Sequence, residues 1–168
     1  MNRDLMQMVD WCQYVVGEHA TSVNGFWHQS LSQAGADYQT LSLDFSPAGA
    51  IGEGPLAQIS CGMYMPMVWP EAISFRAPAA LQVCCERGIA FIDLPSTLVW
   101  FDEAGRHLES LDNERPAGEL LLWQFHRQVT RFVRDTSNLQ DVFSALKILA
   151  LGRKSFKESR RVVVGEEI

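Results

Sequence analysis

The sequence has 168 residues, of which 47% are hydrophobic and 20% are charged, and its net charge is −6 at pH 7. This size and balance are typical of one soluble globular domain, so we expect residues 1–168 to form a single domain in the cytoplasm. An acidic chain is a poor ligand for nucleic acid, its apolar runs are too short to cross a membrane, and its first residues lack a leader pattern.

A helix is predicted at the start of the chain. Apolar residues recur at helical spacing from Leu5 to Val16, with Asp4 before them as a cap and Gly17 after them as a stop. Because the sequence opens almost inside this helix, with no strand or linker before it, we expect it to continue something longer.

Three strands are predicted next, at residues 20–29, 38–46 and 55–65, where apolar and polar residues alternate. The loops between them are small, polar or rich in glycine, as turns are. The glycine-rich residues 49–54 lack the G-x-G-x-x-G spacing and precede a strand, which argues against nucleotide binding there.

The rest of the chain is organised around residues 79–112. Turn residues divide this block, and β-branched and aromatic residues fill it, so we predict four strands, at residues 79–86, 89–94, 97–102 and 106–111. Such a ladder must lay one face on apolar groups, which we expect the flanking helices to supply. Before this block, residues 66–78 contain three prolines, which predicts an irregular, rigid segment that crosses from one set of strands to the next. This crossing either reaches over a site or only covers the end of a sheet.

Two helices and a short strand are predicted to end the chain. Pro116 opens the first helix, Ser137 or Asn138 opens the second, and residues 160–164 form the strand. Basic residues gather at the end of the second helix. The helix dipole favours cations there, so a solvated helix end explains the cluster more simply than a phosphate-binding site does. These residues are Arg153, Lys154, Lys157, Arg160 and Arg161.

This order of elements predicts an α+β fold. We expect a mostly antiparallel, open sheet with helices on one face, and no Rossmann domain in this chain. The uncovered face of such a sheet, with its aromatic residues, is a candidate surface for dimerisation or for another domain.

No complete catalytic or metal motif occurs in the sequence. It has no nucleophile elbow, H-E-x-x-H, Walker loop or C-x-x-C, and its four histidines are read as surface or satisfied core residues. The four cysteines are expected to be buried free thiols, with Cys84 and Cys85 on opposite faces of one strand. From its residues alone, the chain shows no catalytic set, and we interpret it as a platform.

Three segments together resemble the C-terminal domain of the glucose-fructose oxidoreductase, inositol dehydrogenase and rhizopine-catabolism (Gfo/Idh/MocA) family. They are DLMQMVDWCQYVVGE, CCERGIAFIDLPSTLVWFDEAGRHLESL and ALKILALGRKSFKESRRVVV. The order E-x-G, two strands, E-x-L and two helices, the second ending in G-x-x-S-x-x-x-x-R-x-V, carries the resemblance over essentially the whole chain.

The resemblance implies half of a two-domain enzyme with a glyceraldehyde-3-phosphate-dehydrogenase-like C-terminal domain. In that family a Rossmann domain binds NAD or NADP, and the α+β domain forms a wall of the substrate site and dimerises through its open sheet. A sugar or polyol is the implied substrate, and this chain itself is expected to hold no cofactor or metal.

The resemblance also implies positions for site residues. The family pattern D-x-x-x-H-x-x-D places its His on Gln7 and its last Asp on Asp10. Glutamine cannot relay a proton, so no catalytic residue is predicted. By analogy, Trp69, Glu71 and Arg76 of the crossing are expected near the substrate.

Three functions follow from these observations. The first is a substrate-binding and dimerisation domain of an NAD(P)-dependent oxidoreductase, inactive alone because it cannot hold the hydride carrier. The second is a stand-alone, non-enzymatic oligomerisation or binding module derived from that domain. A small α+β enzyme with its own pocket is the third.

Overall fold

The computed structural model describes residues 2–29, 36–47, 49–50, 52–62, 81–93, 97–111, 115–130 and 137–166. The chain divides into two compact units. One unit comprises Met1–Pro66 and Asp135–Ile168, and the other is Met67–Arg134. The proline-rich crossing at residues 66–78 lies outside the described residues.

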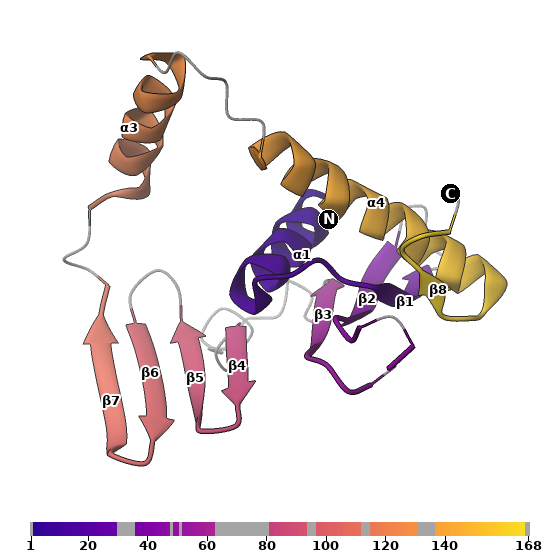
Figure 1. The fold of residues 1–168 in the computed structure, drawn as a ribbon, viewed down its shortest axis with the longest axis horizontal. Helices are drawn as coiled ribbons and strands as arrows, with labels where there is room; N and C mark the ends of the chain where they lie inside the picture. Colours follow the sequence, from indigo (N-terminus) through magenta and orange to yellow (C-terminus); the bar gives the residue numbers. More distant parts are fainter. Residues whose placement is uncertain are drawn as a thin grey trace, which may run out of the picture. The chain divides into compact units, whose positions relative to one another are not determined.

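The first unit is an antiparallel sheet with two helices (Figure 1). Its sheet has the order β3-β2-β1-β8, with every pair antiparallel. The elements are α1 (Asn2–Val16), β1 (Ser22–Gln29), β2 (Ala36–Asp44), β3 (Leu56–Gly62), α4 (Ser137–Glu158) and β8 (Val162–Val163). All six are predicted by the sequence, and their ends differ from the predicted ones by a few residues.

The core of this unit lies between one face of the sheet and the two helices. Alternate residues of the sheet, such as Leu41, Leu43 and Ile59, are buried, and α1 and α4 place their apolar stripes against them. The buried helix residues are Leu5, Val9 and Cys12 on α1, and Ala145, Ile148 and Leu151 on α4. Each large apolar side chain buried this way contributes about 1.5–3 kcal/mol.

Helix α4 approaches β1 closely because both elements carry a glycine at the contact. A Cβ on Gly25 would lie 2.5 Å from the carbonyl oxygen of Gly152, and one on Gly152 would lie 2.6 Å from a methyl of Leu41. Beside this contact the Gly25 amide donates to the buried hydroxyl of Ser155 at 3.1 Å. The Ser155 hydroxyl in turn lies 2.6 Å from the Arg160 carbonyl, which fixes the chain as it leaves α4.

A buried carboxylate anchors the glycine-rich loop after β2. Asp44 Oδ1 accepts hydrogen bonds from the amide and hydroxyl of Ser46, and its Oδ2 accepts one from Arg161 at 3.0 Å. The Ser46 oxygen accepts from the amides of Gly52, at 3.0 Å, and Gly54, at 2.9 Å. The Ser46 hydroxyl first, with Arg161 assisting, holds the pKa of Asp44 below its ordinary value.

The second unit contains the predicted four-strand ladder. Its sheet has the order β4-β5-β6-β7, formed by β4 (Leu81–Cys85), β5 (Gly88–Asp93), β6 (Thr97–Asp102) and β7 (Gly105–Ser110). The antiparallel registers place Phe91, Val99 and Leu108 on one face and Ile92 and Leu98 on the other. Both faces are therefore apolar, so the ladder needs cover on two sides.

The helices α1 and α4 pack against β1 and β3 of their own unit. The third described helix, α3 (Ala117–Thr130), belongs to the same unit as the ladder, and its described side chains are exposed, Leu122 at 72% and Phe125 at 66%. None of the described helices is long and apolar enough to cross a membrane.

Changing Gly25 to Ala is expected to lower the free energy of unfolding by about 1–3 kcal/mol, because the added methyl would overlap the α4 backbone. Urea denaturation measures this change. Gly118→Ala is the matched control, since nothing lies within 4 Å of a Cβ there. Equal stability of the Gly25 variant and the wild type would contradict the close approach.

Changing Asp44 to Asn is expected to destabilise the chain by about 1–3 kcal/mol at neutral pH, because the buried amide and hydroxyl of Ser46 lose a charged acceptor. Since folding lowers the pKa of Asp44, its contribution is present above the ordinary value of 3.8 and is lost as the pH falls below it. The difference in urea midpoint between the wild type and Asp44→Asn should therefore be smaller at pH 3 than at pH 7. The exposed Asp10→Asn variant should show no such convergence.

Candidate functional site

A groove of about 670 Å³ runs along α1 and the turn that follows it. Three elements supply its lining. They are α1 with Gln7, Asp10, Trp11, Gln13 and Tyr14, the following turn with Gly17, Glu18 and His19, and the first part of α4 with Asp141.

The periodicity of α1 explains why these residues share one surface. Gln7, Asp10 and Tyr14 follow the i, i+3, i+7 spacing of a helix face, whereas the core stripe of Leu5 and Val9 lies on another face. The helix ends at Gly17, which has φ of 80° and donates its amide to the Gln13 carbonyl at 2.8 Å. This turn brings residues 18 and 19 back to the groove.

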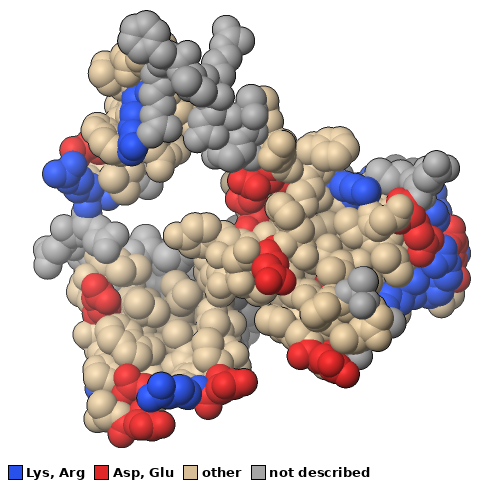
Figure 2. Space-filling model, in the orientation of Figure 1, with Lys and Arg blue, Asp and Glu red and all other residues tan. Residues whose placement is uncertain are grey.

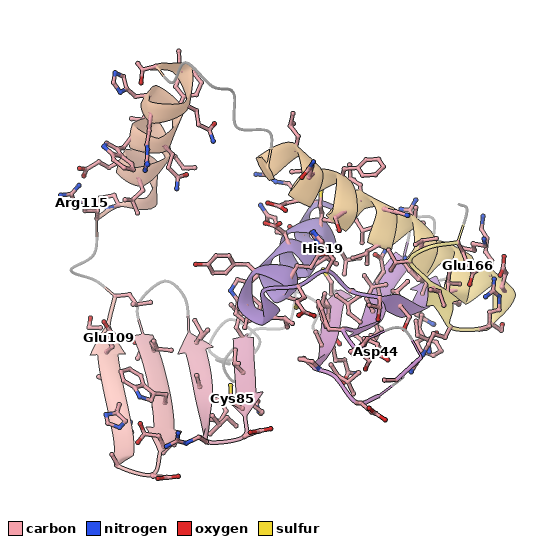
Figure 3. The ribbon with its side chains drawn as sticks, viewed as in Figure 1. His19, Asp44, Cys85, Glu109, Arg115 and Glu166 are labelled. Atoms are coloured by element: carbon pink, nitrogen blue, oxygen red, sulfur yellow. The ribbon has the colours of Figure 1, made fainter. Side chains whose placement is uncertain are left out.

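Gln13 ties the three elements of the groove together. It is only 6% exposed, and its side-chain oxygen lies 3.0 Å from His19 Nδ1 and accepts from the Ser144 hydroxyl at 2.9 Å. Figure 3 shows His19 where the end of α1 meets α4. The other side-chain atom of Gln13, Nε2, is buried and has no hydrogen-bond partner among the described residues.

The groove is acidic and rich in hydrogen-bond acceptors. Asp10, Glu18 and Asp141 line it, and no Lys or Arg does so among the residues placed by the structure. Trp11 and Tyr14 add flat apolar surface, with Tyr14 85% exposed. Within the described ranges, no three His, Cys, Asp or Glu side chains come together to hold a metal ion. Hydroxyl groups suit this set of acceptors and rings better than anions do.

The structure brings together part of the expected site. Gln7 and Asp10 both line the groove, whereas Trp69, Glu71 and Arg76 lie outside the described residues. His19 is the groove residue that the sequence reasoning missed. The available signal was the stop at Gly17, since a tight turn after an amphipathic helix returns the next residues to the helix end.

The cysteines differ in part from the prediction. Cys12 is buried, and desolvation raises its pKa to about 11, so it is an inert thiol at neutral pH. Cys61 is half-buried, while Cys84 and Cys85 are exposed, which corrects the expectation of four buried thiols. Both lie on β4, where the ladder pairs Cys84 with Ile89 and Cys85 with Gly88.

Carboxylates occupy the basic cluster at the end of α4. Arg160 binds Glu158 at 2.7 Å and Glu166 at 2.6 Å, and the hydrogen bonds from Arg160 lower the pKa of Glu166 to about 2. Lys154 lies 3.8 Å from Glu166, and Arg161 binds Asp44. Figure 2 shows the basic and acidic side chains side by side at this end of the helix. The arrangement agrees with a solvated helix end better than with a phosphate site.

The glycine-rich residues 49–54 do not fit a dinucleotide. The amides of Gly52 and Gly54, which a phosphate would need, already donate to Ser46, and β3 follows instead of a helix. The described part of the chain thus offers no dinucleotide cradle at the one turn that resembles it.

No family model and no curated protein matches the sequence. Solved structures do match. An oxidoreductase from Agrobacterium radiobacter, in complex with NAD+, L-tartaric acid and magnesium, has a TM-score of 0.70 at 11% identity over 95% of this chain and 47% of its own. An NAD-binding oxidoreductase from Klebsiella pneumoniae has a TM-score of 0.67 at 11% identity over 97% and 50%.

An NAD-binding protein from Listeria innocua has a TM-score of 0.59 at 15% identity, over 96% of this chain and 46% of its own. The chain spans about half the length of these structures, and at such identities what is shared is the fold. The expected likeness in fold is therefore confirmed. The chain has the α+β fold of about one half of each of these NAD-binding proteins.

Proposed function

We propose that the chain is the substrate-binding half of a cytoplasmic, NAD(P)-dependent oxidoreductase of the Gfo/Idh/MocA family that acts on a sugar or polyol. The observation that carries the proposal is the groove on α1, on which Gln7 and Asp10 both lie. These are the two positions at which the family pattern D-x-x-x-H-x-x-D has its His and its last Asp. The likeness in fold to NAD-binding oxidoreductases supports the same conclusion.

The chemistry of the groove favours a neutral polyol. A hydroxyl donates to the carboxylates of Asp10, Glu18 or Asp141, and a ring face of the ligand can lie on Trp11. The neighbour from Agrobacterium radiobacter binds L-tartaric acid, a dianion at neutral pH. Three carboxylates with no lining cation among the described residues would repel such an anion, so we expect a different substrate here.

The nucleotide would be held by a part of the enzyme beyond this fold. Bound NAD or NADP would supply the hydride chemistry, while the groove residues bind and orient the hydroxyl. The 168-residue chain is therefore expected to bind polyols without turning them over.

Calorimetric titration with a panel of neutral sugars and polyols should give saturable binding to the wild-type chain, and tartrate should give none. Asp10→Asn should weaken polyol binding about tenfold or more, because a charged acceptor is worth about 1.5 kcal/mol. Glu103→Gln, at a turn where the side chain is 81% exposed, is the neutral control. Polyol affinity unchanged in Asp10→Asn would contradict the placement of the substrate.

We also infer that the chain forms a homodimer through the β4–β7 sheet. One face of that sheet carries Phe91, Val99 and Phe101, with Phe91 and Phe101 packed edge to face at 6.3 Å, and Leu108 on the same face is 62% exposed. A second copy would remove this surface from water. A homodimer is also expected if the chain is a stand-alone oligomerisation module. The calorimetric titration distinguishes the two functions, because only the enzyme half is expected to bind polyols.

Changing Leu108 to Lys should convert the dimer to a monomer, since it places a charge on the apolar face, opposite Val99. Light scattering coupled to size-exclusion chromatography measures the mass. Leu56→Lys is the matched control, because Leu56 is exposed to 68% on a strand of the other sheet. A wild-type chain that is monomeric at every concentration would disprove the inference.

A further inference from the structure

We propose that His19 Nε2 is the atom of the groove that accepts the hydrogen bond of a substrate hydroxyl, which makes His19 a specificity and positioning residue of the site. The inference rests on the proposed function, because it assumes that the groove holds a polyol. It starts from the only histidine that lines the groove among the described residues.

The contacts of Gln13 fix the tautomer of His19. The side-chain oxygen of Gln13 can only accept, and it lies 3.0 Å from His19 Nδ1, so Nδ1 must carry the hydrogen. The Ser144 hydroxyl donates to the same Gln13 oxygen at 2.9 Å, and its own oxygen lies 3.3 Å from Nδ1. A neutral imidazole with its hydrogen on Nδ1 has an unprotonated Nε2, which is an acceptor.

The same cluster leaves one donor without a partner. Gln13 Nε2 has none among the described residues, and Gln13 is only 6% exposed although it lines the groove. Gln13 is therefore held in place through its side-chain oxygen, by His19 and Ser144. A hydroxyl group of a ligand can donate to His19 Nε2. A carboxylate ligand has only acceptors and cannot donate to His19 Nε2.

Acidic and polar groups share the groove with His19. Asp10, Gln13 and Tyr14 of α1, Glu18 of the turn and Asp141 of α4 line it together with His19. The Ser144 hydroxyl of α4 lies 3.3 Å from His19 Nδ1.

The imidazole nitrogens report the contact directly in the chain labelled with 15N-histidine. In the free chain, long-range 15N–1H correlations should show the hydrogen of His19 on Nδ1. Adding the polyol that binds best should move the Nε2 resonance in a saturable manner. The signals of His28, on β1 and outside the groove lining, should stay in place.

Two variants separate the acceptor from the fold. His19→Asn keeps a donor near the place of Nδ1 but lacks Nε2, so it should keep the melting temperature and lose about tenfold or more in polyol affinity. His19→Gln carries an amide oxygen near the place of Nε2, so it should restore affinity to within about threefold. His28→Asn is the matched control and should bind as the wild type does.

The outcomes distinguish this inference from the function on which it rests. No saturable binding of any polyol to the wild type overturns the proposed function, and the inference with it. Polyol binding with the His19 resonances unmoved, with Nδ1 unprotonated, or with full affinity in His19→Asn overturns the inference alone.

Discussion

The contact between α4 and β1 is the constraint on which the rest of the first unit depends. Gly152 and Gly25 let the helix backbone approach the strand, and the buried Ser155 joins the two through the Gly25 amide. This contact sets the position of α4 on the sheet, and α1 packs between α4 and β3. The groove is built from both helices, so its geometry depends on these two glycines and the small side chain of Ser155. Side chains of ordinary size there would separate the helix from the sheet.

Helix α1 serves the core and the groove at once. Its buried stripe of Leu5, Val9 and Cys12 holds it on the sheet, while another face presents Gln7 and Asp10. Gln13 stands between these roles, because it is buried like a core residue but hydrogen-bonded like a site residue. Burying an amide costs free energy unless its atoms are paired, and only one end of Gln13 is paired by the described residues. That half-paired state is typical of a residue retained for its function.

The elements could be predicted from the sequence because each has local signals. Gly17 follows the end of α1, whose first turn contains Asp4, and strict alternation around Leu41 and Leu43 identifies β2. The division of the strands into two sheets has no such signal, because hydrogen bonding between strands links residues far apart in sequence. His19 was missed for the same reason. Its partner Ser144 is 125 residues away, and neither residue is unusual by itself.

The charged residues at the end of α4 and those of the groove differ in how they are paired. The chain has 14 basic residues, and three of those at the end of α4, Lys154, Arg160 and Arg161, form ion pairs with Glu158, Glu166 or Asp44. The carboxylates of the groove, Asp10, Glu18 and Asp141, have no such cation among the residues that line it in the described part of the chain. Among the described residues, ion pairs thus hold the chain end, whereas the lining of the groove carries carboxylates without a lysine or arginine. Because carboxylates accept hydrogen bonds, a ligand with several hydroxyl donors suits this lining better than an anion does.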